Sequence, residues 1–150
     1  MAASTVFYKR STFVTHLPAE ALFSPSHYWL MPEADNVWRV GFTKFATRML
    51  GDLVDHQFEK QSGENVSSGE IVGSVEGFKA ISDLYSPVTG SFAGGNPALQ
   101  KDPEIIGTDP YGEGWLFRIA GTPDARCTAV EGYRSLLDAT IDRMLEKEGV

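Results

Sequence analysis

Lys79 is the residue whose neighbours most suggest chemistry. It lies in the stretch VEGFKAISDLYSPVTG, residues 75–90, and strand-like apolar segments on both sides predict a hairpin with this lysine at its tip. Glu76 and Asp83 are three and four residues from Lys79, so in a hairpin they lie on the two strands just below the tip and place negative charge around the exposed amine. A solvated turn with charges at its rim explains the same pattern without any function.

Three functions are open to a lysine at such a tip. A Schiff-base or general-base lysine requires burial to lower its pKa, which an exposed turn does not provide. A single surface cation is a weak anchor for docking. Attachment of a prosthetic group requires rigid strands below the amine and small residues beside it, and Gly77 and Ala80 meet that requirement.

The other candidate groups form weaker patterns. The three histidines are isolated from each other and Cys127 is alone, so none has the paired spacing of a zinc site and we expect no metal. No G-x-S-x-G elbow is present, which removes one signature of a catalytic serine. Gly112 and Gly114 precede a strand and not a helix, so they predict a turn and not a phosphate loop.

Length and charge restrict the class of protein. A chain of 150 residues can support a single core, so we expect one domain. Its 13 basic and 20 acidic residues give a formal charge of -7, which repels phosphate backbones and argues against nucleic-acid partners. Apolar runs are too short to span a membrane, a secretory signal is not recognisable, and there is one cysteine, so we expect a soluble, cytoplasmic protein.

Apolar alternation and turn residues predict a mainly β core. The expected strands are short, and they lie at 13–17 after a frayed start, at 28–30, at 37–40 after a turn over 32–36, on both sides of Lys79, and at 115–119. The recurring Gly63, Gly69, Gly73 and Gly77 are expected to mark breaks between short strands.

Helices are predicted at three places. Thr43 can cap a short helix that Gly51 ends in the left-handed conformation, and Asn96 can cap a second one with Pro97 as its first residue. Near the C-terminus, apolar residues recur at the spacing of one helical face, namely Tyr133, Leu136, Leu137, Ile141, Met144 and Leu145.

Taken together, the motifs resemble the H protein family of the glycine cleavage system. The resemblance rests on SPSHYWL, VGFTKFATRMLGDLV, EGFKAISDLYSPVTG, NPAL, DPEIIGTDPYGEGWLF and LLDATI, which occur in family order over about residues 22–141. It implies a mainly β barrel-sandwich hybrid, like lipoyl and biotinyl domains, with short helices and a C-terminal helix. Residues 1–21 are then an N-terminal extension, 22–127 the lipoyl domain, and 128–150 a C-terminal helix packed on it.

The resemblance also implies a cofactor and partners. Lys79 would carry lipoate in amide linkage, attached by a lipoate ligase or lipoyl transferase. The chain would be a non-catalytic carrier that shuttles an aminomethyl group and reducing equivalents between glycine decarboxylase, aminomethyltransferase and dihydrolipoyl dehydrogenase. Residues around the attachment site are expected to be recognised by these enzymes, and others to line a cleft for the arm. The first set is Glu76, Gly77, Phe78, Ala80 and Asp83, and the second is Ser26, His27 and Tyr28.

Two departures from the family pattern leave the cargo open. Gly77 and Phe78 precede the lysine where the family commonly has Ser or Thr and Val, and Tyr28 replaces the glutamate of a His-Glu-Trp triplet. A tyrosine cannot offer a carboxylate to an ammonium group. The alternative is an H-protein-like lipoate carrier that moves sulfur and electrons for a heterodisulfide-reductase-like complex. Asp83 is retained, so the loss of the site for an amine is not complete.

Overall fold

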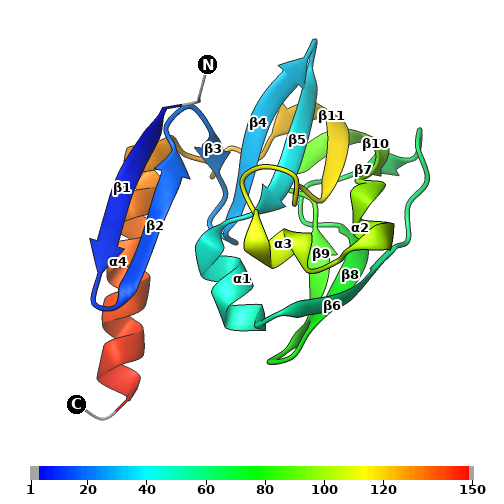
Figure 1. The fold of residues 1–150 in the computed structure, drawn as a ribbon. Helices are drawn as coiled ribbons and strands as arrows, with labels where there is room; N and C mark the ends of the chain where they lie inside the picture. The colour runs from blue at the N-terminus through cyan, green and yellow to red at the C-terminus, as the bar shows by residue number, and fades with distance from the viewer. Residues whose placement is uncertain (1–3, 149–150) are drawn as a thin grey trace.

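Residues 4–148 of the computed structural model form three β-sheets and four helices (Figure 1). In chain order the elements are β1 (Thr5–Arg10), β2 (Phe13–Pro18), β3 (Leu22–Phe23), β4 (Tyr28–Ala34), β5 (Val37–Phe42), α1 (Lys44–Leu50), β6 (Leu53–Phe58), β7 (Asn65–Val66), β8 (Ile71–Gly77), β9 (Ile81–Tyr85), β10 (Val88–Gly95), α2 (Ala98–Lys101), α3 (Ile105–Thr108), β11 (Phe117–Pro123) and α4 (Val130–Lys147). A six-stranded sheet has the order β3-β4-β5-β11-β10-β7, a three-stranded sheet has the order β6-β8-β9, and β1 pairs with β2 alone.

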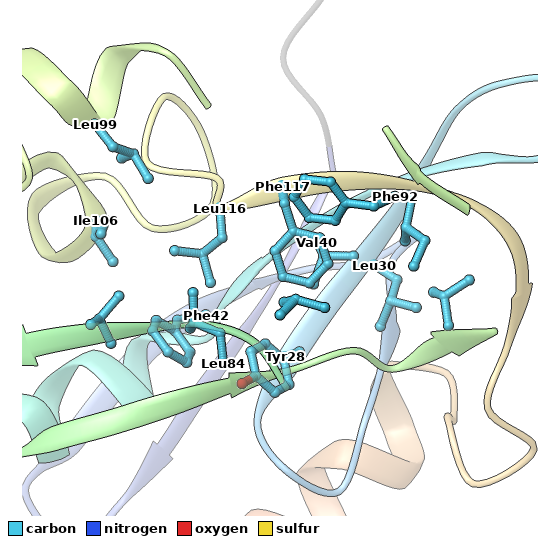
Figure 2. Close-up of a cluster of buried hydrophobic side chains, with 14 of the residues drawn as sticks. Tyr28, Leu30, Val40, Phe42, Leu84, Phe92, Leu99, Ile106, Leu116 and Phe117 are labelled. Carbon is cyan, nitrogen blue, oxygen red and sulfur yellow. The ribbon is translucent and has the colours of Figure 1, made fainter. Parts of the chain in front are cut away.

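The main core lies between the two larger sheets. Leu30, Val40 and Phe117 come from the six-stranded sheet, and Val75 and Leu84 come from the three-stranded one; all are at most 1% exposed. Figure 2 shows four of these side chains, all except Val75, directed into one interior. Each fully buried side chain of this size contributes about 1.5–3 kcal/mol. Two sheets packed through one core confirm the expected mainly β, barrel-sandwich arrangement.

A second core joins the two ends of the chain. Tyr8 and Leu17 of the β1–β2 hairpin pack with Trp29 of β4 and with Tyr133 and Leu137 of α4. Residues 5–10, which we expected to be frayed, therefore form β1, because this packing buries one face of the strand. The C-terminal helix packs on the same body, while the domain limits at residues 21 and 127 stay a prediction.

The predicted helices are present. Thr43 caps α1 through a bond from Ala46 N to its hydroxyl at 3.5 Å. Helix α4 contains all the residues of the predicted apolar face, although Leu145 is exposed. The side chain of Asn96 accepts from Ala98 N at 3.0 Å, so it caps α2 as expected, although the helix itself begins at Ala98 and not at Pro97. The short helix α3 was not predicted, because four residues do not make a recognisable repeat.

Some strand limits differ from those predicted. Pro32 pairs with Trp38 inside the β4–β5 hairpin, so the expected turn over 32–36 shortens to residues 35 and 36, where Asn36 takes a φ of 60°. The strand expected at 115–119 begins at Phe117 and runs on to Pro123. Pairing across the sheet therefore decides where these strands begin and end.

Two of the four recurring glycines do not separate strands. Gly63 and Gly69 lie between strands as expected, with φ of 94° and 88°. Gly73 and Gly77 instead lie inside β8. A Cβ on Gly73 would come within 2.2 Å of the carbonyl oxygen of Gln57 on β6, so this glycine permits close strand contact.

Candidate attachment site at Lys79

Lys79 lies at the tip of the β8–β9 hairpin, as predicted. Glu76 pairs with Ile81, and the backbone N–H of Gly77 donates to the carbonyl of Ala80 at 2.8 Å, so Phe78 and Lys79 form the loop. The side chain of Phe78 is 77% exposed, and Lys79 and Ala80 are exposed too. The lysine amine is therefore accessible to a modifying enzyme.

The hairpin tip is held against the C-terminal end of α1. Lys79 N donates to the carbonyl of Leu50 at 2.9 Å, and Phe78 N donates to that of Asp52 at 3.0 Å. The Lys79 ammonium reaches the carbonyl of Arg48 at 3.4 Å. Carbonyls at the end of a helix have no partners within it, so the hairpin supplies donors that α1 lacks. An exposed lysine thus stands on an anchored backbone.

Two glycines permit this close approach. A Cβ on Gly77 would lie 2.2 Å from the Leu50 carbonyl oxygen, and one on Gly51 would lie 2.9 Å from Cγ of Lys79. Gly51 has a φ of 76° and a ψ of -169°, so the expected positive φ is present. Its ψ is extended rather than left-handed helical, a region that glycine alone occupies readily. The contacts of Leu50 and Gly51 with the lysine loop were missed from sequence, and only the helix-ending glycine gave a signal.

Acidic and apolar side chains lie on the strands below the hairpin tip. Glu76 and Asp83 are exposed on the two strands below the tip, where we expected them, and Asp55 of β6 pairs with Glu76. Ile81, which pairs with Glu76, is 73% exposed. Phe78 and Ile81 are therefore two exposed apolar residues at the tip, and Glu76 and Asp83 are exposed on the strands beside them. Such a surface suits partners with apolar pockets and basic rims.

The predicted cleft residues meet in a groove between α1 and β9, here called the α1–β9 groove. Its volume is about 250 Å³. Its lining comprises Ser26, His27, Tyr28, Phe42, Phe45, Ala46, Met49, Leu50, Ser82, Asp83 and Tyr85. Among these described lining residues, Asp83 is the one carboxylate. The groove can therefore hold an extended apolar group that ends in a cation.

Tyr28 lies in this groove as a neutral group. Its hydroxyl accepts from Tyr85 N at 2.9 Å, and its ring stacks on Phe42 with centroids 5.2 Å apart. Burial raises the pKa of the Tyr28 hydroxyl above its usual range. The tyrosine thus fixes the end of β9 and leaves the acidic role in the groove to Asp83.

His27 is neutral too, and its backbone is unusual. It has a φ of 71°, which few residues other than glycine adopt. Its Nδ1 lies 2.8 Å from the hydroxyl of Tyr133, and its ring lies 4.7 Å from that of Phe45. Burial lowers the pKa of His27 to about 4, so it carries no charge at neutral pH. Tyr133 also lies 2.7 Å from the Thr43 hydroxyl, which links α4 to the start of α1.

Lys79 itself opens onto a different groove, on the other side of α1. This α1–α3 groove has a volume of about 660 Å³ and includes Lys44, Arg48, Asp52 and Glu104. The structure brings Ser26, His27, Tyr28 and Asp83 together, but it does not place the lysine among them. Leu50 joins the two regions, since it lines the α1–β9 groove and accepts the Lys79 amide.

Other sequence features carry less chemistry. Within residues 4–148, three or more His, Cys, Asp or Glu side chains do not gather as a metal site requires. None of the helices in that range is long and apolar enough to cross a membrane. Cys127 is half-buried, and burial raises the pKa of its thiol to about 11. It is therefore a poor nucleophile.

Comparison with known proteins gives one consistent family. The family model described as "Glycine cleavage H-protein" matches residues 21–142. A glycine cleavage system H protein of Salmonella arizonae is 38% identical over 136 residues, covering 90% of this chain and all of the relative. One from an Enterobacter species is 39% identical over 127 residues, covering 85% and 93%. The crystal structure of such a protein from Mycobacterium marinum is 37% identical, with a TM-score of 0.71 over 79% of this chain and 97% of the other.

Proposed function

The chain belongs to the glycine cleavage H-protein family, and on that premise we propose that Lys79 is its lipoyl attachment site. The protein is a carrier component of the glycine cleavage system that shuttles intermediates between the enzymes of that system. Lipoate, once attached, supplies a reducible disulfide on a flexible arm. The exposed amine on an anchored loop is the observation that carries the proposal.

The surroundings of Lys79 fit an amide-linked group. The ammonium donates to the carbonyl of Arg48 at 3.4 Å, and the N–H of an amide remains a donor for the same oxygen. Lys79 and Ala80 are exposed, and backbone bonds to Leu50 and Asp52 keep the loop in place without using the lysine side chain. Acylation would remove one positive charge and leave these backbone contacts intact.

The α1–β9 groove supports an amine as the cargo. Asp83 supplies a carboxylate for a cationic end group, while Ser26 and Ser82 supply hydroxyls. His27 is neutral and adds no repulsion to a cation. The loss of the family glutamate at Tyr28 is thus not a loss of all negative charge. Neither the described residues nor these relatives favour the sulfur-carrying alternative.

The enzymes that would act on the chain follow from the family. A lipoate ligase or lipoyl transferase would modify Lys79, and glycine decarboxylase, aminomethyltransferase and dihydrolipoyl dehydrogenase would receive the arm. Tethering raises the effective concentration of a bound group at each active site in turn. No catalytic step is assigned to side chains of this chain, and its cytoplasmic location stays a prediction.

Reconstitution tests the proposed carrier role. The purified protein, lipoylated by a ligase, is given to glycine decarboxylase, and we expect glycine-dependent CO₂ release that increases with carrier concentration. Lys79→Arg should support none, whereas Lys101→Arg, which changes a lysine on α2, should match the unaltered protein. Lipoylated protein that supports no CO₂ release would contradict the glycine role.

A further inference from the structure

The N-terminal hairpin, residues 5–18, lies outside the family match at 21–142, yet it is an integral part of the fold. Its inward face is buried, with Tyr8, Phe13 and Leu17 at most 5% exposed. Figure 1 shows the hairpin lying along α4, with β2 on the side toward α1. A segment that the matched family region does not include therefore packs beside the site.

The hairpin is fixed to α4 by polar contacts. Tyr8 donates its hydroxyl proton to Asp138 at 2.7 Å. Arg10 donates two bonds to Asp142, at 2.7 and 3.1 Å. Two parallel bonds between a guanidinium and a carboxylate fix the relative orientation of the two groups as well as their distance. One side of the hairpin is thus held by the C-terminal helix.

Its other contacts lead to α1. The ring of Phe13 meets that of Phe45 edge-on, with centroids 5.6 Å apart, and the guanidinium of Arg48 lies 5.7 Å above the Phe13 ring. Thr15 lies 3.4 Å from the hydroxyl of Tyr111. That hydroxyl in turn accepts the backbone N–H of Lys44, the first residue of α1, at 2.9 Å. Phe13 therefore contacts α1 directly, and Thr15 is linked to its first residue through Tyr111.

The two α1 residues against Phe13 face the functional site. Phe45 lines the α1–β9 groove and packs on His27, while the carbonyl of Arg48 receives the Lys79 ammonium. Helix α1 has only seven residues. Helices this short are not stable alone in water, so packing must determine where α1 sits. Leu50 packs into the main core, and Phe13 packs on the part of α1 that carries Phe45 and Arg48.

We propose that Phe13 is a positioning residue for the arm site. By packing on Phe45 and Arg48, it fixes α1 as the common wall of the α1–β9 groove and of the lysine loop. The hairpin is then the part of this chain that sets the shape of the groove, beyond what residues 21–142 supply. The role in carrying an arm rests on the proposed function, but the effect on α1 does not.

Hydrogen exchange of the unmodified protein tests the effect on α1. Phe13→Ala removes the ring, and Leu17→Ala is the matched control. Leu17 lies on the same strand and is buried like Phe13, but it is about 13 Å further along the strand. We expect the amides of residues 47–51 to exchange about tenfold faster in Phe13→Ala than in Leu17→Ala. Phe13→Leu, which retains apolar volume, should restore slow exchange. Equal rates in the two alanine variants would overturn the proposal.

A second variant and a second measurement complete the test. If Phe13→Ala does not fold, Phe13→Val replaces it in the same comparison with Leu17→Ala. After lipoylation, confirmed by mass, Phe13→Ala should lower kcat with glycine decarboxylase more than Leu17→Ala does, because α1 carries both the groove and the anchor of the lysine loop. Faster exchange in a protein that is never lipoylated would retain the positioning of α1 and overturn the proposed function. Lipoylated protein with unchanged exchange would overturn the positioning alone.

Discussion

Gly77→Ser examines how the lysine loop is held. A Cβ at this position would lie 2.2 Å from the Leu50 carbonyl oxygen and 2.9 Å from its carbon. Both are backbone atoms, so no side-chain rotation relieves the overlap. We expect the serine to displace the hairpin tip from the end of α1.

The cost follows from the bonds that anchor the tip. Displacement breaks the bond from Lys79 N to Leu50, 2.9 Å long, and the one from Phe78 N to Asp52, 3.0 Å long. Each backbone hydrogen bond contributes about 1 kcal/mol net, so the free energy of unfolding should fall by about 2 kcal/mol. With a urea m value of about 2 kcal/mol per molar, the unfolding midpoint should fall by about 1 M.

Urea unfolding of the unmodified protein measures this change, and amide exchange locates it. Ala80→Ser is the control, since it places the same hydroxyl on an exposed residue of the same tip. We expect its midpoint to be unchanged, and we expect faster exchange at Phe78 and Lys79 only in Gly77→Ser. Equal midpoints for the two serine variants would refute the close approach of β8 to α1.

Two substitutions and one reactivity measurement test individual groups. His27→Asn should flatten the pH dependence of stability, because the pKa of His27 is near 6.5 in the unfolded chain but about 4 in the folded one. As the pH falls from 6.5 to 4, the free energy of unfolding of the unaltered protein should therefore fall by on the order of 3 kcal/mol. Thermal unfolding of both proteins at each pH tests this. An equal fall in the variant would show that His27 is not responsible. Thr43→Ala removes the cap of α1 and a partner 2.7 Å from Tyr133, and should lower stability by about 1–2 kcal/mol in urea unfolding. Cys127 should react with iodoacetamide at pH 8 much more slowly than free cysteine, because burial raises the pKa of its thiol to about 11, and alkylation at the free rate would contradict its burial.

Local patterns predicted much of the fold. Thr43 and Gly51 mark the limits of α1, and the apolar face of α4 is regular, so both helices were visible in the sequence. The strand at residues 5–10 was not, because its burial depends on α4, far along the chain. Gly73 and Gly77 were misread as breaks, since their function is to let distant backbone approach, which spacing alone does not reveal.

The local features of the site could be predicted from the sequence, but its contacts with distant residues could not. Lys79 at a hairpin tip, with Glu76 and Asp83 below it, follows from the sequence, and the structure places all three there. The tip is anchored by the hydrogen bond from Lys79 N to Leu50, two residues far apart in the chain, and no local signal encodes this contact. The link from Phe13 to α1 is equally remote. These contacts become visible only when the chain is folded.

The central claim is that Lys79 carries the lipoyl group, and peptide mass mapping after co-expression with a lipoate ligase and lipoate tests it most directly. We expect the peptide containing Lys79 to gain the mass of one lipoyl amide, Lys79→Arg to gain none, and Lys44→Arg, which changes a neighbouring lysine on α1, to be modified like the unaltered protein. An unmodified Lys79, or a lipoyl group on another lysine, would contradict the account.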